Sequence, residues 1–364
     1  GGEVVRGEGT IGTNGATTTI TQGSRQIAID WESFNVGVDE TVRFVQPSET
    51  ATALNRIFDQ NPSQIFGIVE ANGRVILINP NGMLFGPSAQ LNVASLVASS
   101  LNISVDDFMS GNYTFESAGG EGGLVLNQGS INSDFVALIG EAVANEGLIV
   151  ADAGVVELAA GKKIAIDFDG AGLMFFESDS DILQSAVDVD SAVSNSGTIV
   201  ADGGRVLLTT AAARDVYTQA INNSGVIQAS RIDNSGGVIR LSGGDGVTLN
   251  SGLLDASGDS ASDGGSVQVT GRFVGLTGDA SINADGGANG GQVLIGGAFQ
   301  GGDAGVQNAE RTYVSSGSEI SANAGNAGDG GEVIVWADEI TSYYGNISAT
   351  GGAAGGNGGF AEVS

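Results

Sequence analysis

The chain has 364 residues, with no Cys, no His and a net charge of −29. The absence of Cys excludes disulfide frameworks and thiolate metal sites, and the absence of His excludes Ser-His-Asp catalysis and the usual zinc sites. The strong negative charge repels phosphate backbones, so nucleic acid is not an expected partner. There are 61 Gly but only 4 Pro, and Val, Ile, Thr, Asn and Ser abound, which favours strands and turns.

No apolar run approaches the roughly 20 residues that a membrane helix needs. The sequence begins at Gly1 without the basic and apolar regions of a signal peptide. We therefore expect either a cytoplasmic chain or a mature form whose signal has been removed. A chain without Cys also suits passage through an oxidising periplasm in the unfolded state, because no disulfide can staple it.

The first 60 residues predict an antiparallel cap of short strands. Asn14-Gly15 is a typical two-residue hairpin turn, because both residues tolerate positive φ. The expected strands, separated by Gly and Asn, are 4–5, 17–20, 26–31 and 42–45. The last of these strands ends before Pro47.

Segment 50–59 predicts a short helix within this cap. Four apolar residues fall at helical spacing on one face, namely Ala53, Leu54, Ile57 and Phe58. Four aromatic side chains of the cap are expected to plug one end of the core: Trp31, Phe34, Phe44 and Phe58.

Residues 64–85 contain two turn signals. Asn72-Gly73 lies between two apolar runs and predicts a hairpin or another turn. Asn79-Pro80-Asn81-Gly82 predicts a rigid four-residue corner, because Pro80 fixes φ at the second position and the next two residues tolerate the left-handed conformation. The Asn79 side chain can bond to the backbone two residues on.

From about residue 124 a phrase recurs: Asn or Ser, any residue, Gly, any residue, then Ile or Leu. The Ile or Leu of this phrase and its equivalents stands at positions 131, 149, 199, 227, 254, 282, 320 and 347, with gaps of 18, 50, 28, 27, 28, 38 and 27 residues. Such self-similarity indicates stacked units that cannot bury their apolar faces alone. Between Leu254 and Ile282 the chain holds three strand-like pieces separated by Gly corners, which describe a three-sided parallel coil.

We therefore expect an all-β fold: a right-handed, three-sided parallel β-helix with an N-terminal antiparallel cap and β insertions outside the helix. Residues 1–364 are expected to form a single domain, with cap strands in 1–60 and the β-helix in 61–364. The two long gaps predict insertions near 162–193 and 299–311. Asn residues at the same corner of successive coils are expected to stack into a hydrogen-bonded side-chain ladder.

No catalytic, cofactor or metal site is expected, and we predict that the chain is not an enzyme. The G-x-G-x-x-G match at 7–12 is not followed by a helical pattern, so the context of a dinucleotide site is missing. Polysaccharide-cleaving β-helix enzymes need two or three carboxylates on one face. The candidates are the pairs Asp167/Asp169, Asp179/Asp181 and Asp188/Asp190. These pairs are better explained as a solvated acidic face of the first insertion.

Residues 55–86 carry a resemblance to a known family. They read Asn55-Arg56-Ile57, then Ser63-Gln64-Ile65-Phe66-Gly67, then Asn72-Gly73-Arg74-Val75-Ile76-Leu77-Ile78, and finally Asn79-Pro80-Asn81-Gly82-Met83-Leu84-Phe85-Gly86. This stretch resembles the N-terminal secretion (TPS) domain of two-partner secretion exoproteins (TpsA), of the filamentous haemagglutinin and high-molecular-weight adhesin type. The resemblance extends over essentially the whole chain, to Asn112-Tyr113-Thr114-Phe115-Glu116 and Ile334-Val335-Trp336. Met83 departs mildly from it, since family members usually have Ile or Val there.

The resemblance implies a secretion signal that also nucleates folding. Such domains enter the periplasm unfolded, after a cleaved signal peptide, and the POTRA modules of a dedicated outer-membrane transporter (TpsB) recognise them there. Folding then begins outside the cell, where the growing β-helix templates the rest of a large adhesin. The expected location is the surface of a Gram-negative bacterium or its surroundings. The expected partners of this monomer are the transporter and the downstream adhesin region of the same chain.

The site residues that the resemblance implies are Asn79, Pro80, Asn81 and Gly82, together with Asn55 and Arg56. Their expected role is a stabilising turn and part of the recognised signal. Turn geometry alone is the alternative, and the sequence leaves it open.

Two other functions also stay open. One is a β-helix enzyme that cleaves polysaccharide, and the other is a matrix protein that binds surface glycans or cations. We further expect a longer chain to continue beyond Ser364, because 360–363 predicts one more strand rather than a stop. The adhesive target would then bind mostly downstream.

Overall fold

The computed structural model describes residues 1–117, 122–168, 175–176, 189–211, 216–233 and 237–364. They form two compact units. Unit 1 comprises Gly1–Val150 and Glu157–Val189, and unit 2 comprises Ala151–Val156 and Asp190–Ser364.

Unit 1 begins with an antiparallel arrangement of short strands. Strand β1 (Gly2–Arg6) pairs antiparallel with β4 (Gln26–Trp31), and β2 (Gly9–Asn14) with β3 (Thr17–Gln22). Asn14 lies opposite Thr17, so Gly15 and Ala16 form the loop, with Gly15 at φ 59°. The predicted hairpin is therefore confirmed, but its two turn residues are Gly15 and Ala16 and not Asn14 and Gly15.

The rest of unit 1 is built mainly from parallel strands on three faces. The first face contains β3, β5 (Thr41–Val45), the first halves of β8 (Ile68–Ile78) and β10 (Gln90–Ser99), β13 (Ser130–Asn132) and β16 (Leu148–Val150). The second contains β4, β6 (Thr52–Ile57), the second halves of β8 and β10, and β14 (Phe135–Gly140). The third contains β7 (Ser63–Ile65), β9 (Met83–Phe85), β12 (Leu124–Asn127) and β15 (Ala142–Asn145).

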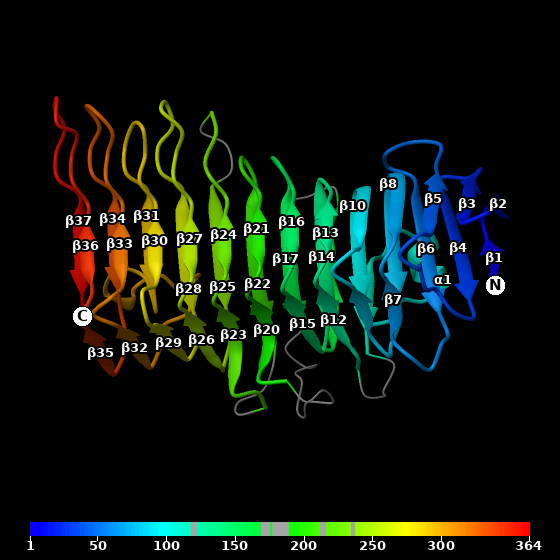
Figure 1. Cartoon of the computed structure of the whole chain (residues 1–364). Helices are drawn as coiled ribbons and strands as arrows, with labels where there is room; N and C mark the ends of the chain where they lie inside the picture. Colours follow the sequence, from blue (N-terminus) through cyan, green and yellow to red (C-terminus); the bar gives the residue numbers. More distant parts are fainter. Residues whose placement is uncertain (118–121, 169–174, 177–188, 212–215, 234–236) are drawn as a thin grey trace. The chain divides into compact units, whose positions relative to one another are not determined.

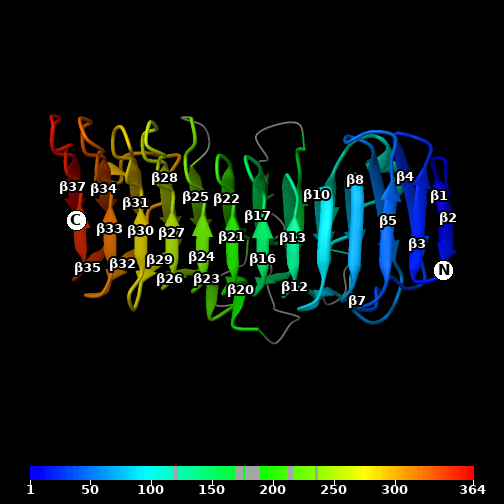
Figure 2. The same ribbon diagram turned by 45° about the horizontal axis from the view of Figure 1, so that its top comes forward.

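Unit 2 also has three faces, each built from separate short strands, which Figures 1 and 2 show in rows. The first face contains β21 (Thr198–Val200), β24 (Val226–Gln228), β27 (Leu253–Asp255), β30 (Ser281–Asn283), β33 (Glu319–Ser321) and β36 (Asn346–Ser348). The second contains β22 (Arg205–Thr210), β25 (Val238–Ser242), β28 (Ser266–Thr270), β31 (Gln292–Ile295), β34 (Glu332–Val335) and β37 (Phe360–Val363). The third contains β20 (Ser191–Asn195), β23 (Gln219–Asn223), β26 (Val247–Asn250), β29 (Phe273–Leu276), β32 (Arg311–Val314) and β35 (Ile340–Tyr343). The predicted all-β, parallel β-helix fold is confirmed.

The recurring Ile or Leu marks the register of the first face. Ile131 pairs with Ile149 in unit 1. In unit 2 the pairing runs without a slip through Ile199, Ile227, Leu254, Ile282, Ile320 and Ile347. All of these side chains except Ile347 are buried. Because a slip by one residue would turn each of them to the outside, the repeat fixes the register of the coils.

The predicted Asn ladder is present in both units. In unit 1 the Asn127 side chain donates to the Asn145 side chain at 2.8 Å. In unit 2 Asn195 donates to Asn223, and Asn223 to Asn250, each at 2.7 Å. These amides are buried, so each bond satisfies polar groups that water does not reach.

The predicted helix at 50–59 is wrong. Residues 52–57 form β6, which pairs parallel with β4 on one side and β8 on the other. Nearly every side chain of β6 is buried, so its apolar residues show no strand alternation and match helical spacing by chance. Of the four aromatic residues of the cap, Trp31, Phe34 and Phe44 are buried, but Phe58 is 62% exposed.

At Asn72-Gly73, where a hairpin or turn is predicted, the chain turns a corner but forms no hairpin. Strand β8 runs through both residues and only bends there: its first half pairs with β5 and its second half with β6. Asn72 stabilises the bend, because its side chain donates to the Gln46 carbonyl and accepts from the Gln46 N–H, both at 2.8 Å. A Cβ on Gly73 would lie 2.7 Å from the Ala51 carbonyl oxygen, so this corner requires Gly.

Other elements interrupt or extend the coils. The short helix α1 (Val105–Met109), capped by Ser104, was not predicted. Strand β18 (Lys163–Ala165) pairs antiparallel with β11 (Thr114–Glu116) and with β19 (Phe175–Phe176), while 169–174 and 177–188 of the expected first insertion lie outside the described residues. In the second expected insertion, the 3-10 turn η2 (Phe299–Gly301) separates β31 from β32. Strand β17 (Val155–Ala160) supplies residues to both units.

Replacing Asn223 with Ala tests the contribution of the ladder. Asn223 is buried and bonded to an Asn on either side, so its loss leaves two amides short of a partner. We expect the free energy of unfolding to fall by about 2 kcal/mol, measured by urea denaturation. The control is Asn222→Ala on the same strand, where the side chain is half-buried and outside the ladder. An equal loss in the two variants would contradict the ladder's role.

Candidate functional site

The corner at Asn79-Pro80-Asn81-Gly82 connects β8 to β9. The Gly82 N–H donates to the Asn79 carbonyl at 2.9 Å, and the Asn81 N–H donates to the Asn79 side-chain oxygen at 3.0 Å. Both bonds close the turn expected from the sequence, with Pro80 holding φ at its second position. Gly82 has φ 103° and its Cβ would lie 2.7 Å from the Leu124 carbonyl oxygen, so only Gly fits there.

Asn79 is the buried centre of this corner. Its side chain is 0% exposed, and its amide nitrogen donates to the Asn61 carbonyl and to the Ser63 hydroxyl, both at 3.0 Å. Its backbone N–H donates to Ser99 on the next coil at 3.0 Å. The polar atoms of Asn79 therefore all have partners inside unit 1, and none faces solvent.

Asn81 and Pro80 extend the same network. The exposed Asn81 side chain donates to the Asp59 carbonyl at 2.8 Å. The Pro80 carbonyl accepts from the Gly123 N–H at 2.8 Å, which ties the corner to the following coil. The turn thus holds the loop 58–63 at two points, through Asn79 and through Asn81.

Asn55 is part of the core and not of the surface. It is 0% exposed, accepts from the Trp31 indole N–H at 3.0 Å, and donates to the Ala53 and Ile76 carbonyls at 3.2 Å. These bonds satisfy a buried amide and a buried indole between β4, β6 and β8. The arrangement gives Asn55 a structural role.

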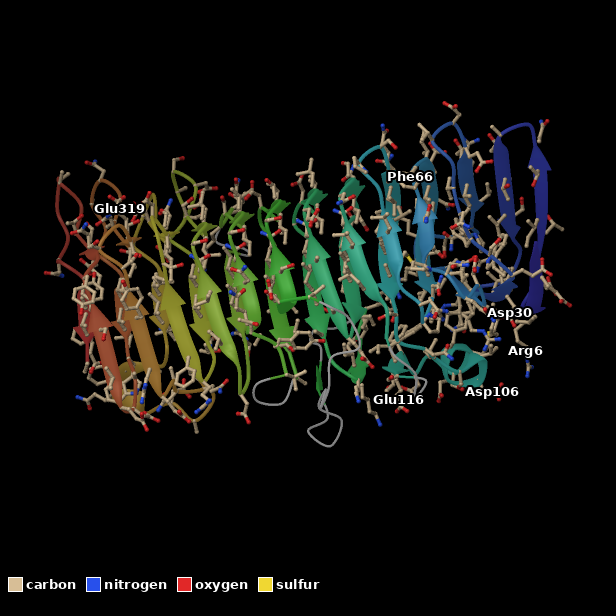
Figure 3. The ribbon with its side chains drawn as sticks, turned by 60° about the horizontal axis from the view of Figure 1, so that its bottom comes forward. Arg6, Asp30, Phe66, Asp106, Glu116 and Glu319 are labelled. Atoms are coloured by element: carbon tan, nitrogen blue, oxygen red, sulfur yellow. The ribbon has the colours of Figure 1, made fainter. Side chains whose placement is uncertain are left out.

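Arg56 lies at the edge of the surface and is held rigidly. Its guanidinium makes two hydrogen bonds to the carboxylate of Asp30, at 2.8 and 2.7 Å. It also lies 5.4 Å from the ring centroid of Phe58, within the range of a cation–π contact. Figure 3 labels Asp30 at the end of unit 1 that also carries the Arg6–Asp106 ion pair, whose atoms are 3.4 Å apart.

The structure brings the two parts of the expected site together through one loop. Asn79 and Asn81 bind loop 58–63 from one side, and Arg56 lies just before it on β6. The loop exposes Phe58, which rests against Arg56 and whose N–H donates to the Trp31 carbonyl at 2.9 Å. The sequence did not reveal this role of the loop, because the motif reaches it mainly through main-chain carbonyls.

Among the described residues, no group of three or more His, Cys, Asp or Glu could hold a metal ion. Of the carboxylates weighed for catalysis, Asp169, Asp179, Asp181 and Asp188 lie outside the described residues, while Asp167 and Asp190 are exposed. No helix in the described part of the chain is long and apolar enough to cross a membrane.

Asn79→Ala is expected to destabilise unit 1 far more than Asn81→Ala. The first change strips partners from the Asn61 carbonyl, the Ser63 hydroxyl and the Asn81 N–H around a buried position. We expect a loss of about 2–3 kcal/mol in the free energy of unfolding for Asn79→Ala and of less than about 1 kcal/mol for the exposed Asn81. Urea denaturation of both variants measures the difference, and equal midpoints would show that the corner is not organised by Asn79.

Comparison with known proteins agrees with the fold. The model of the TPS secretion domain family matches residues 1–256. A heme/hemopexin-binding protein of Haemophilus influenzae (strain ATCC 51907 / DSM 11121 / KW20 / Rd) is 34% identical over 269 residues, which are 71% of this chain and 28% of that protein. A second heme/hemopexin-binding protein of Haemophilus influenzae is 30% identical over 256 residues, 64% of this chain and 26% of that protein.

The solved structures include a close counterpart. The crystal structure of the HMW1 secretion domain from Haemophilus influenzae matches with a TM-score of 0.86 and 31% sequence identity, over 100% of this chain and 94% of that one. The chain spans only about a quarter of the length of the two curated relatives. With a family match over more than half its length, the chain belongs to the TPS secretion domain family, the secretion domain of TpsA exoproteins.

Proposed function

We propose that this domain is the export signal and folding start of a large adhesin. In this proposal the POTRA modules of a cognate outer-membrane TpsB transporter recognise it in the periplasm, and it begins β-helix folding at the cell surface. The observation that carries the proposal is the family match over residues 1–256. Proteins with this domain are secreted exoproteins of Gram-negative bacteria, and the family is not one of known enzymes.

The strand pairing supports sequential folding outside the cell. Within unit 2, each strand of the first face pairs with the equivalent strand of the next coil, as β24 does with β27 and β27 with β30. Contacts of this kind form locally and add one coil at a time, so emerging chain can fold without waiting for distant segments. A folded coil cannot slide back through a transporter, which favours outward movement.

Unit 1 supplies the features of a starting point. Strands β8 and β10 each run across two faces of the coil and pair with one another along both. The Asn79 corner locks the end of β8 to the next coil through Ser99. Long strands paired along two faces, with a locked corner, would hold these early coils together before later coils stack on them.

The locked corner also bears on how the motif acts in recognition. Asn79 is buried and fully bonded, so in the folded domain it has no free group for a partner. Next to it the Phe58 ring is exposed, and the Arg56 guanidinium lies beside that ring while paired with Asp30. Aromatic and Arg side chains are the usual anchors of protein interfaces. We therefore propose that this corner and its loop form locally before the coils stack, and we assign the contact with the transporter to Phe58 and Arg56, with the Asn79 corner as their support.

A secretion assay separates recognition from stability. The full exoprotein is expressed with and without its transporter, and the secreted fraction is compared for Asn79→Ala and for Leu138→Ala, a buried position on β14 that should cost about 2–5 kcal/mol of stability. We expect Asn79→Ala to lower secretion more than Leu138→Ala does at equal measured stability. A loss that follows stability alone restricts the motif to turn geometry. Secretion that persists without any transporter rejects the proposed function itself.

Phe58→Ala should reduce transporter-dependent secretion without weakening the fold. Because the ring is largely exposed, its removal should change the free energy of unfolding by less than about 1 kcal/mol, while loss of an interface anchor should weaken binding to the isolated POTRA modules about tenfold or more. The matched control is Val38→Ala, which removes another exposed apolar side chain of unit 1. Unchanged POTRA binding by Phe58→Ala would remove this residue from the interface.

A further inference from the structure

The outer surface of the third face of unit 2 changes from polar to apolar along its coils. One row of outward positions, in which each residue pairs with the next across adjacent strands, runs over five strands. Its members are Ser194 on β20, Asn222 on β23, Leu249 on β26, Gly275 on β29 and Tyr313 on β32. The first two are polar, and the last three border an apolar hollow. Figure 1 shows strands β26, β29, β32 and β35 side by side in this part of unit 2.

The hollow has a volume of about 530 Å³ and lies over these four strands. Its floor is Gly275, which contributes no side chain to the row between Leu249 and Tyr313. Those two residues are two strand spacings apart, about 10 Å. The Tyr313 ring is 44% exposed and forms one wall, and Phe273 and Ile340 of the adjacent row form another.

Two arginines lie near the Phe273 ring, and one of them, Arg311, lines the hollow. The Arg272 guanidinium lies 4.3 Å from the Phe273 ring centroid and pairs with Glu310 at 3.0 Å. Arg311 lies 6.0 Å from the same centroid and 3.5 Å from Glu339. These contacts hold the Phe273 ring in place. Each cation is balanced by a carboxylate, so the site is near neutral in a chain of net charge −29.

The size of the hollow indicates its occupant. It is lined by 11 residues, whereas a stable protein–protein interface engages about 20–30 residues on each side. Its volume falls within the range of about 300–1,000 Å³ that is typical of small-ligand sites. A second copy of the chain or a large protein partner would find too little surface here, and a compact ligand fits.

The chemistry of the lining narrows the ligand class further. Aromatic faces carry partial negative charge and attract the weakly positive C–H face of a sugar ring. Tyr313, Thr277 and Ser342 supply hydroxyl groups at the same hollow. An anionic saccharide would be repelled by the acidic protein. We propose that this hollow is a binding subsite for one or two pyranose units of a neutral polysaccharide.

Titration calorimetry with three uncharged probes tests the subsite: cellohexaose, maltohexaose and the hexamer of N-acetylglucosamine. We expect at least one of them to bind the intact protein, and Tyr313→Ala to weaken that binding about tenfold or more. Gly275→Leu should abolish it by filling the floor, where a new Cβ would displace only the end of the Leu249 side chain, 2.7 Å away, and would lie in ordinary contact with Thr277 at 3.6 Å. The control Asn222→Ala lies on the same face beyond the hollow and should bind as the unaltered protein does.

Three results would overturn the subsite. They are no binding of any probe at millimolar concentration, equal binding by Tyr313→Ala, and tighter binding of polygalacturonate than of the neutral probes. If the molecular mass in solution rises with protein concentration and Tyr313→Ala removes this rise, the hollow is a self-association surface. That result would also reject the sugar site. Transporter-dependent secretion of Tyr313→Ala should be unchanged, so failure of this inference and failure of the proposed export function are distinguishable.

Discussion

Parallel backbone pairing between successive coils is the constraint on which the rest of the structure depends. At the corners, the coils approach so closely that backbone meets backbone. A Cβ on Gly291 would lie 2.1 Å from the Gly265 carbonyl oxygen, and one on Gly331 would lie 2.0 Å from that of Gly291. Side chains are excluded from these positions, which accounts for much of the Gly content. Burial determines which residues occupy the inward positions. These take Ile, Leu or Val, or an Asn whose side chain bonds to the Asn of a neighbouring coil.

This constraint explains which parts of the fold could be predicted from the sequence. The positions of Ile227, Leu254 and Ile282 repeat because each pairs with the next, so their spacing reports the register directly. Local chemistry was sufficient for the Gly15 hairpin and for the Asn79 corner, whose bonds lie within four residues. Where long-range pairing decides the conformation, prediction failed. The side chains of β6 are buried by strands from either side, and their helical spacing carried no information about those partners.

The same reasoning separates the predictable from the unpredictable part of the site. The turn at Asn79 could be predicted because it has a local signature, whereas its place in the site came from the family resemblance. The hydrogen bonds from Asn79 and Asn81 to loop 58–63 could not be predicted, because the acceptors at Asn61 and Asp59 are main-chain carbonyls that any residue would supply. The exposed ring of Phe58 looked like core material, since hydrophobicity alone does not tell a strand end from a strand interior. The aromatic hollow could not be predicted for another reason. Leu249, Gly275 and Tyr313 are far apart in sequence and meet only when the coils stack.

In a stacked coil, the residues that hold the fold together and the residues that form the outer surface occupy separate, regularly spaced positions, unlike those of a conventional globular core. Pairing between coils restricts which residues can occupy the inward and corner positions. The side chains at outward positions do not enter the core, so these positions are free to vary. Ser194 and Tyr313 occupy equivalent outward positions on one face, yet one is small and polar and the other is a large exposed aromatic. A change at such a position alters the surface without disturbing the register beneath it. The requirement to fold coil by coil during export and the freedom to acquire a binding surface therefore rest on different residues of the same coil.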